Sequence, residues 1–363
     1  MPELPHTITR PADLEALAAS LAEHEAIGLD TEFMRERTYR AELCLLQASA
    51  PGHAACIDPL ALGSLAPVAE LLREARPVKV LHAARQDLEV LEPVFGPVAP
   101  VFDTQVAAAL AGFPAQIGYA ELVRQLLDVT LEKAHTRADW SRRPLRPEQI
   151  EYALDDVRHL LPLREVLRER LERLHRTAWL DEELASLATA RSFPPDPEEA
   201  HLRMKGLQAL GPERRELGRR MAAWRERRAI ERNRPRGWIL DDSALREILI
   251  RLPRTPAGLE AIPELPAAFV KHSGAEILDL IQAAGLPDPA PPLPRRERPD
   301  AAQLARLKRL SGIVQTVAQE LSLSAEVLAT RRDLEQLAEG TGSPRVLRGW
   351  RRELLGARLR QAL

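Results

Sequence analysis

Two proline-rich stretches constrain the folding of this chain more than any other feature of its sequence. They read SFPPDPEE at 192–199 and PDPAPPLPRRERPD at 287–300. Proline has a fixed φ and no backbone N–H, so such runs disfavour helix interiors and central strands. We therefore interpret both stretches as linkers, which divide the 363 residues into predicted domains at 1–190, 200–285 and 300–363.

The first predicted domain mixes strand and helix patterns. Short apolar runs predict strands at 26–30, 42–48, 54–57, 78–81 and 99–102. Amphipathic patterns predict helices at 11–23, 64–74, 84–92, 104–111, 118–127 and 147–175. Because several strands follow one another before helices separate them, the order predicts an α/β domain with a mixed sheet.

The other two predicted domains are helical throughout and are distantly alike. LDDSALREILIRLP at 240–253 and LSAEVLATRRDLEQL at 323–337 each follow a long basic helix. VKHSGAEILDLI at 270–281 corresponds loosely to VLRGWRRELLGARL at 346–359. We predict two copies of one small helical bundle.

Composition narrows the class of protein. The sequence has no apolar run long enough for a membrane span, and its N-terminus lacks the apolar core of a signal peptide. Its two cysteines, Cys44 and Cys56, form no metal-binding motif, which argues against disulfide scaffolding and structural zinc. These features predict a cytoplasmic protein without a membrane partner.

The net charge of −2 hides a strong asymmetry. Residues 1–190 carry 20 basic and 30 acidic side chains, a net −10, whereas residues 191–363 carry 31 and 23, a net +8. Such a division favours metal chemistry in the acidic part and attraction of a polyanion by the basic part. The alternative is a set of solvated arginine-rich helix faces.

Two carboxylates mark the end of the first predicted central strand. Asp30 and Glu32, in GLDTEFM, lie two positions apart and therefore project from the same face of the strand. Ligands of open α/β sheets usually bind at such strand ends. A divalent cation would offset the repulsion between the two charges, although a solvated strand end is the simpler alternative.

Further acids follow on predicted helices. Asp87 falls in the first turns after the strand VKVL, where it could also serve only as a cap. In EYALDDVRHLLPL, Tyr152 and Asp156 are four residues apart and share one helix face beside an apolar stripe. A tyrosine aligned with an acid on a half-buried flank favours a functional role over surface charge.

The three motifs, DTEF, H-x-x-x-x-D and Y-x-x-x-D, occur in this order on an α/β scaffold. They resemble the exonuclease domain of the DEDD superfamily in its tyrosine-bearing branch. IDPL at 57–60, HAARQDLEVL at 82–91, FDTQ at 102–105 and ADWSRRPL at 138–145 extend the resemblance to the ribonuclease D family. LPRTPAGLEAI at 252–262 and HSGAEILDLI at 272–281 resemble its HRDC (helicase and ribonuclease D C-terminal) domains.

This resemblance implies a ribonuclease H-like mixed sheet followed by two all-α bundles. It implies a 3′–5′ exoribonuclease that releases nucleoside 5′-monophosphates from structured RNA 3′ ends, with tRNA precursors as the expected substrate. It also implies two divalent ions, Mg²⁺ or Mn²⁺, held by carboxylates. Asp30 would bridge both ions, Glu32 and Asp156 would complete one site, Asp87 would support the other, and Tyr152 would orient the attacking water.

Other residues are candidates for substrate binding, each with a structural alternative. Phe33 and Met34 could wedge against the terminal base or belong to the core. Gln47 could reach the terminal sugar, and His82 could contact substrate or hydrogen-bond loop backbone. The stretch HTRADWSRRPLRP interleaves an aromatic ring with guanidinium groups, a combination that suits single-stranded RNA; its candidates are Arg137, Trp140, Arg142 and Arg143.

The basic helix of the second predicted domain is a candidate for phosphate contacts. Its arginines recur at helical spacing: Arg214, Arg215, Arg219, Arg220, Arg225, Arg227 and Arg228. Outside the active centre, Asp103 and Asp139 are predicted to cap the segments that follow them. Two other functions remain open from the sequence: a DNA 3′–5′ exonuclease for proofreading or repair, and a non-catalytic RNA-binding scaffold. Nothing in the sequence requires more than a monomer.

Overall fold

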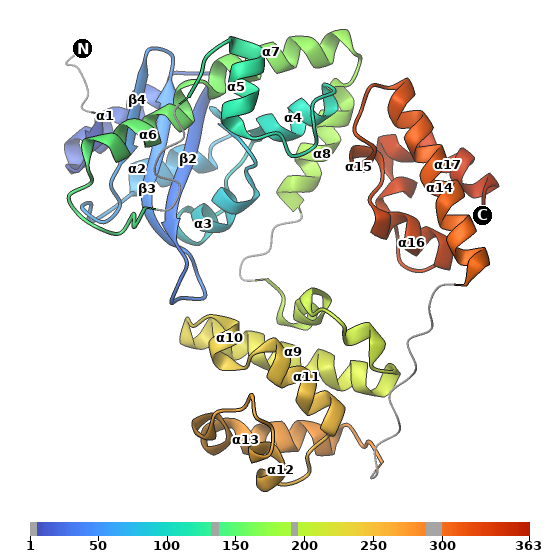
Figure 1. The fold of residues 1–363 in the computed structure, drawn as a ribbon. Helices are drawn as coiled ribbons and strands as arrows, with labels where there is room; N and C mark the ends of the chain where they lie inside the picture. The colour runs from blue at the N-terminus through green and yellow to red at the C-terminus, as the bar shows by residue number, and fades with distance from the viewer. Residues whose placement is uncertain (1–5, 132–137, 190–194, 288–299) are drawn as a thin grey trace. The chain divides into compact units, whose positions relative to one another are not determined.

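A computed structural model describes residues 6–131, 138–189, 195–287 and 300–363 (Figure 1). The chain forms two compact units. The first comprises Met1–Met34, Leu43–Arg191 and Pro299–Leu363, and the second comprises Arg35–Glu42 and Ser192–Arg298. The predicted linkers lie largely outside the described residues, except that the first ends within a 3₁₀ helix, η1 (Pro197–Arg203).

A six-stranded mixed sheet forms the centre of the first unit, in the order β1-β4-β3-β2-β5-β6. β3 and β4 pair antiparallel, whereas β1 with β4, β2 with β5 and β5 with β6 pair parallel. The strands are β1 (Thr7–Ile8), β2 (Ala26–Met34), β3 (Glu42–Ala50), β4 (His53–Ile57), β5 (Val78–Leu81) and β6 (Val101–Asp103). The predicted mixed α/β sheet is confirmed, with the two-residue β1 added.

Eight helices accompany this sheet among the described residues. They are α1 (Pro11–Ala22), α2 (Ala66–Arg73), α3 (Arg85–Phe95), α4 (Thr104–Leu110), α5 (Tyr119–Leu127), α6 (Pro147–Arg158), α7 (Leu160–Arg173) and α8 (Thr177–Thr189). The single helix predicted at 147–175 is wrong, because it breaks at His159. Pro162 has no N–H to donate to the carbonyl four residues earlier, which prevents a continuous helix here.

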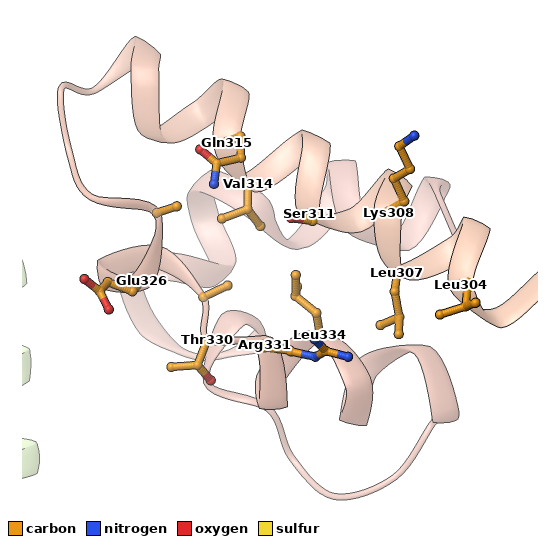
Figure 2. A pocket seen from close by; sticks show the side chains of 12 residues that line it. Leu304, Leu307, Lys308, Ser311, Val314, Gln315, Glu326, Thr330, Arg331 and Leu334 are labelled. Carbon is orange, nitrogen blue, oxygen red and sulfur yellow. The ribbon is translucent and has the colours of Figure 1, made fainter. Parts of the chain in front are cut away.

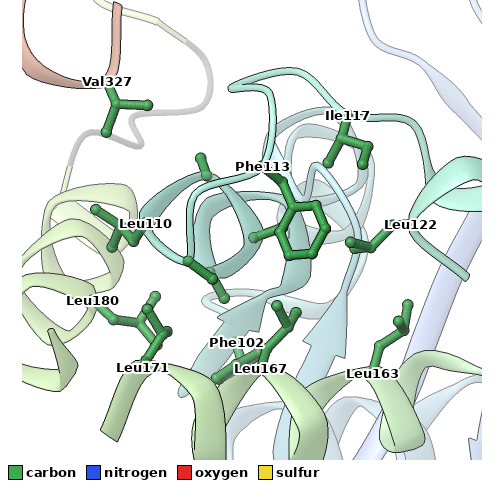
Figure 3. Close-up of a cluster of buried hydrophobic side chains, with 14 of the residues drawn as sticks. Phe102, Leu110, Phe113, Ile117, Leu122, Leu163, Leu167, Leu171, Leu180 and Val327 are labelled. Atoms are coloured by element: carbon green, nitrogen blue, oxygen red, sulfur yellow. The ribbon is translucent and has the colours of Figure 1, made fainter. Parts of the chain in front are cut away.

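The apolar core of the first unit continues from the sheet into the C-terminal bundle. Phe102, Phe113 and Leu167 pack together, and Val327 of the bundle belongs to the same cluster (Figure 3). The bundle consists of α14 (Ala301–Glu320), α15 (Ala325–Leu328), α16 (Arg331–Glu339), η3 (Arg345–Leu347) and α17 (Gly349–Gln361). The first unit therefore combines the sheet domain and this bundle around one core.

Aromatic and charged contacts join α8 to the C-terminal bundle. The rings of Trp179 and Trp350 stack with centroids 4.6 Å apart. Glu183 accepts hydrogen bonds from the indole N–H of Trp350 and from the guanidinium of Arg351, whose side chain is buried. Glu182 accepts from the backbone N–H of Trp350, at the start of α17.

The second unit is helical, with an added segment from the chain after β2. Its elements are η1, η2 (Leu207–Ala209), α9 (Pro212–Arg232), α10 (Arg236–Ile239), α11 (Asp242–Arg251), α12 (Pro256–Glu260) and α13 (Ala267–Ala283). Within this unit, Tyr39 donates to Glu226 and the N–H of Arg40 donates to Asn233. Both bundles place a long helix before a four-residue helix, which confirms the predicted pair of helical bundles. No helix in the described part of the chain has the length and apolarity to span a membrane.

Candidate active site

The strand β2 presents both of its acids toward helix α6. Asp30, Glu32 and Gly28 occupy alternate positions and so share a face. A Cβ atom on Gly28 would lie 2.4 Å from Ser49 Oγ and 3.1 Å from the carbonyl oxygen of Val157, which belongs to α6. The absence of a side chain at Gly28 therefore lets α6 approach the strand closely, beside the two acids.

Helix α6 brings the third carboxylate to this face. Carboxylate oxygens of Asp30, Glu32 and Asp156 all lie within 4.8 Å of one another. The two elements are more than 100 residues apart in sequence, and α6 begins with Pro147 in its first turn. The cluster thus depends on the packing of α6 against the sheet. Figure 1 shows α6 lying across the strands.

Asp87 approaches from helix α3 and is held by a neighbour in β2. The hydroxyl of Thr31 donates to a carboxylate oxygen of Asp87 at 2.6 Å. Asp87 itself is buried in the first turn of α3. It lies outside the three-carboxylate cluster but close enough for its charge to raise the pKa of Asp30. Thr31 was not expected to have a role, because its function depends on a residue 56 positions away.

Burial and mutual repulsion make these acids weak. Burial is the main cause in each case, and it raises the pKa of Asp30 well above its ordinary range, with added repulsion from Asp87, Asp156 and Glu32. Burial raises the pKa of Glu32 to about 8, that of Asp156 to about 7 and that of Asp87 to about 6. A positive ion at this place would favour the charged forms of all four.

Tyr152 lies one helical turn from Asp156 and hydrogen-bonds to its carboxylate. Burial and the charges of Asp156 and Glu32 raise the pKa of the phenol above its ordinary value. The hydroxyl therefore stays protonated at neutral pH and acts as a donor toward anionic oxygen. The ring of Trp140 packs 6.3 Å from that of Tyr152, centroid to centroid, and supports its orientation.

The donor set fits a hard divalent cation. All four acids offer carboxylate oxygen, and neither His nor Cys belongs to the cluster that the described residues form. Oxygen ligands of this kind suit Mg²⁺ or Mn²⁺ and disfavour zinc in a structural site. Burial and the like charges of these acids impose an electrostatic cost that such an ion would remove.

Two residues near the centre were not singled out as functional from the sequence. Tyr119 donates to the carbonyl oxygen of Asp155 at 3.0 Å and accepts from the N–H of His159 at 3.3 Å, so it holds the junction between α6 and α7. Asp103 was predicted only as a cap, and it does cap α4. It also accepts from the N–H groups of Ala83 and Ala84, which fixes the turn before α3. A lone tyrosine in a helix gives no sequence signal for such a contact.

Three of the substrate-binding candidates are engaged inside the protein. His82 uses one ring nitrogen toward the Thr104 hydroxyl and the other toward the carbonyl of Ile117, at 2.9 and 3.0 Å. Trp140 is buried, so no base can stack on it in this conformation. Arg143 donates to both oxygens of Asp58 and to backbone carbonyls. These contacts favour the structural alternative for each.

The other candidates differ in accessibility. Phe33 and Met34 are half-buried, and Met34 packs against the apolar core. Arg142 is exposed and pairs with Asp139, which also accepts from Ser141. Gln47 is completely buried in β3 and cannot reach a sugar directly. Arg137 lies outside the described residues.

The arginines of α9 do not form the free basic row expected from their spacing. Arg214 and Arg225 are buried in the second unit. Ion pairs with glutamates neutralise the next four: Arg219 and Arg220 with Glu216, Arg227 with Glu198, and Arg228 with Glu276. Helical spacing alone could not show this, because the acidic partners come partly from other segments.

A different cluster in the second unit combines arginines with an aromatic ring. Trp238 in α10 is 61% exposed, and the guanidinium of Arg234 lies 5.8 Å from its ring centre. Arg232 lines the same cavity as Trp238, and Arg236 is the first residue of α10. In the part of the chain that the structure describes, Arg232, Arg234 and Arg236 form no ion pair. Beside Trp238 lies a cavity of about 340 Å³, whose lining also includes the acids Asp241 and Glu264.

A larger cavity, of about 520 Å³, lies inside the C-terminal bundle. Figure 2 shows side chains of α14, including Leu307 and Val314, opposite Thr330 and Leu334 across it. Aliphatic and polar side chains contribute equally to its lining, and Glu326 is its one acid among the described residues. It therefore lacks the carboxylate cluster on which the proposed chemistry depends.

Family models match three parts of the chain. Residues 5–172 match a 3′-5′ exonuclease domain, residues 214–281 an HRDC domain, and residues 304–359 the C-terminal HRDC domain of ribonuclease D. These matches cover the sheet domain and both helical bundles. They support the order of modules that the motifs predicted.

Similar proteins match the chain over nearly its full length. Ribonuclease D of Jannaschia sp. is 41% identical, covering 98% of this chain and 94% of the relative. Ribonuclease D of Gluconacetobacter diazotrophicus is also 41% identical, with coverage of 97% and 91%. The crystal structure of Escherichia coli RNase D, described as an exoribonuclease involved in structured RNA processing, superposes with a TM-score of 0.86. It shares 31% identity and covers 98% of each chain.

Proposed function

The chain belongs to the ribonuclease D family and is a 3′–5′ exoribonuclease, and from that premise we propose that it trims structured RNA 3′ ends, with tRNA precursors as substrate, by a two-metal mechanism. The observation that carries the mechanistic part is the cluster of Asp30, Glu32 and Asp156, with oxygens within 4.8 Å of one another. Such a cluster of buried like charges is costly unless a cation is bound there.

Four carboxylates would hold the metal ions. In this proposal Asp30 would be a ligand of both ions, Glu32 and Asp156 would be further ligands of one, and Asp87 would support the other. When bound, two such ions lower the pKa of the attacking water and neutralise the leaving oxygen of the phosphodiester. The contact from Thr31 keeps Asp87 in place, and the close packing of α6 at Gly28 keeps Asp156 beside β2.

Tyr152 positions the attacking water rather than deprotonating it. Its phenol pKa is raised, so it remains a hydrogen-bond donor at the pH of the reaction. Its hydrogen bond to Asp156 and its packing on Trp140 restrict the orientation of the hydroxyl. Correct placement of a nucleophile is worth a large share of a hydrolytic barrier.

The RNA contacts are divided between the two units in this proposal. Half-buried Phe33, directly after the acids, offers an apolar surface for the terminal base, and exposed Arg142 offers a phosphate contact. In the second unit, Trp238 provides a ring for stacking, beside Arg232, Arg234 and Arg236. Guanidinium groups next to an exposed aromatic ring are a common arrangement for unpaired nucleotides.

We also propose three functional domains at 1–190, 200–285 and 300–363, although the third shares a core with the first. All four acids come from a single chain, which is compatible with action as a monomer. Both cysteines are buried and neither is in a disulfide, and that fits a reducing compartment such as the cytoplasm.

Digestion of labelled RNA tests the proposal. A tRNA precursor labelled at its 5′ end should shorten stepwise from the 3′ end with Mg²⁺ or Mn²⁺, and a 3′-labelled precursor should release its label as a mononucleotide first. EDTA or Asp30→Asn should reduce the rate at least 100-fold. Tyr152→Phe should lower kcat much more than RNA affinity. Activity that survives both EDTA and Asp30→Asn would exclude the two-metal mechanism.

The choice of substrate is tested separately. A tRNA precursor with an extended 3′ end is compared with an unstructured RNA of the same length and with the matching DNA. Faster trimming of the precursor supports the tRNA assignment. Equal rates on the two RNAs would remove that assignment while leaving the exoribonuclease activity intact.

A further inference from the structure

Gln47 lies in β3 and faces helix α6. Ser49, two positions along the same strand, donates to the carbonyl oxygen of Val157 in α6 at 2.8 Å. Cys56, the residue paired with Gln47 on β4, lies 4.0 Å from the carbonyl oxygen of Ile150 in α6, measured from its sulfur. Alternate residues of one strand and paired residues of neighbouring strands share a face. Gln47 therefore points at the stretch of α6 between Ile150 and Val157.

The same reasoning places Gln47 next to Asp30. A Cβ atom on Gly28 would lie 2.4 Å from Ser49 Oγ, so these two residues are neighbours across β2 and β3. The short connection from Met34 to Glu42 makes the two strands antiparallel, because a parallel pair needs a longer crossover. Asp30 follows Gly28 by two residues, and Gln47 precedes Ser49 by two residues. In an antiparallel pair these steps keep the residues opposite each other, so Gln47 lies next to Asp30.

The strand order agrees with this placement. On β4, Cys56 is paired with Gln47 of β3, and β2 lies on the other side of β3. Gln47 therefore belongs to the strand between Cys56 and β2, the strand that carries Asp30 and Glu32.

The amide of Gln47 has no explanation in packing alone. Its exposure is 0%, and neither its oxygen nor its nitrogen has a hydrogen-bond partner in the part of the chain that the structure describes. A buried polar group without a partner destabilises the folded state. A leucine would fill a similar volume without this cost, so a group that belongs to the functional state is the better explanation.

We propose that Gln47 is a positioning residue for Asp30, and that its amide N–H hydrogen-bonds to the Asp30 carboxylate, directly or through one water, in the metal-bound state. The inference rests on the proposed metal-dependent function. A hydrogen bond from the Gln47 amide would stabilise the charged carboxylate of Asp30 and restrict its rotation. Groups that hydrogen-bond to metal ligands typically change metal affinity 10–100-fold when they are removed.

Titration of the full-length chain with Mn²⁺ tests this role. Gln47→Leu should weaken the Kd for Mn²⁺ about tenfold, while Tm in EDTA stays unchanged or rises because an unpaired buried amide is removed. Gln149→Leu is the matched control. Gln149 is also a buried glutamine, but its oxygen accepts from the backbone N–H of Arg146 at 3.1 Å. The control should lower Tm in EDTA and leave the Kd unchanged.

The outcomes separate the inference from the function on which it rests. A wild-type chain that binds no Mn²⁺ would overturn both. Wild-type binding together with a Kd within twofold for Gln47→Leu would overturn the positioning role alone. A fall of Tm in EDTA like that of the control, with unchanged Kd, would make Gln47 an ordinary core residue. If Gln47→Leu does not fold, Gln47→Met supports the same comparison, because methionine has a similar length and an unbranched chain.

Discussion

Glu32 shows how burial and neighbouring charges change the ionisation of a single residue in this site. It stands at the end of a central strand, within 4.8 Å of two other carboxylates as measured between oxygens. Burial and the charges of Asp156 and Asp87 raise its pKa to about 8. In the folded, metal-free protein Glu32 therefore holds its proton at pH values where the unfolded chain has lost it.

This difference predicts the pH dependence of stability in EDTA. Because the pKa of Glu32 is higher in the folded protein than in the unfolded chain, the proton on Glu32 stabilises the folded state. This stabilisation is fully present below about pH 4.5 and is lost as the pH rises through about 8. Glu32→Gln cannot lose that proton. Its free energy of unfolding should match wild type at pH 5 and exceed it by roughly 1–3 kcal/mol at pH 8.5. Denaturant unfolding at both pH values measures this, and parallel pH profiles for the two proteins would contradict it.

At the scale of elements, the active centre depends on how closely α6 packs against β2. The acids Asp30 and Glu32 belong to the strand, whereas Tyr152 and Asp156 belong to the helix. Gly28 sets the separation between the two elements, because any Cβ there would collide with Ser49 Oγ at 2.4 Å. The hydrogen bond from Ser49 to Val157 then fixes the register of the contact.

Gly28→Ala should therefore disturb catalysis from a position outside the acid cluster. Displacement of α6 by part of an ångström should lower kcat/KM 10–100-fold, and overpacking should cost about 1–3 kcal/mol of stability. Gly63→Ala is the control, because no atom lies within 4 Å of a Cβ at Gly63. Kinetics with a labelled RNA and thermal unfolding measure both effects. An equal loss of kcat/KM in Gly28→Ala and Gly63→Ala would show that displacement of α6 is not the cause of the lower activity.

At the scale of the whole molecule, the C-terminal bundle is part of the catalytic unit. Its α17 contacts α8 through Trp350 and Arg351, and Glu183 accepts hydrogen bonds from both. The Arg351 side chain is only 5% exposed. Removal of Glu183 would leave a buried cation without its carboxylate partner, which is among the more costly changes in a protein interior.

Glu183→Ala should thus destabilise the first unit by about 3–5 kcal/mol. Glu320→Ala is the matched control, because its ion pair with Arg358 at 3.1 Å is half-exposed on both sides. Exposed pairs contribute about 0–1 kcal/mol. Thermal unfolding of the two variants distinguishes them, and similar Tm values would show that the bundle is not held by this contact.

The second unit should contribute to RNA affinity through its free arginines. Replacing Arg232, Arg234 and Arg236 with glutamine should weaken binding of single-stranded RNA and reduce the slope of log K against log salt by about 2. Arg219→Gln should have a smaller effect, because Arg219 is paired with Glu216 and Glu198. Fluorescence anisotropy between 50 and 200 mM salt measures the slopes; an unchanged slope in the triple variant would exclude this surface.

Local patterns in the sequence predicted most elements, whereas the resemblance to the DEDD superfamily implied the acid set. Alternation placed Asp30 and Glu32 on one face, and helical spacing placed Tyr152 beside Asp156, because both rules depend only on neighbouring residues. The same patterns missed the break at His159, which reflects Pro162 and the contact from Tyr119. The two-residue β1 was also missed, because it exists only through its pairing with β4.

Only the tertiary structure decided which polar side chains are available. The spacing of arginines in α9 could not reveal that Arg225 is buried or that Arg219 is paired, since burial and distant partners have no local signature. Likewise, the sequence made Gln47 a candidate for contact with the terminal sugar. Only the fold shows that its amide is buried and has no hydrogen-bond partner in the described part of the chain. The sequence by itself determined the residue types of the site and, through the family resemblance of its motifs, the chemistry to expect. Long-range packing determined the distances between these residues, their burial and hence their pKa values.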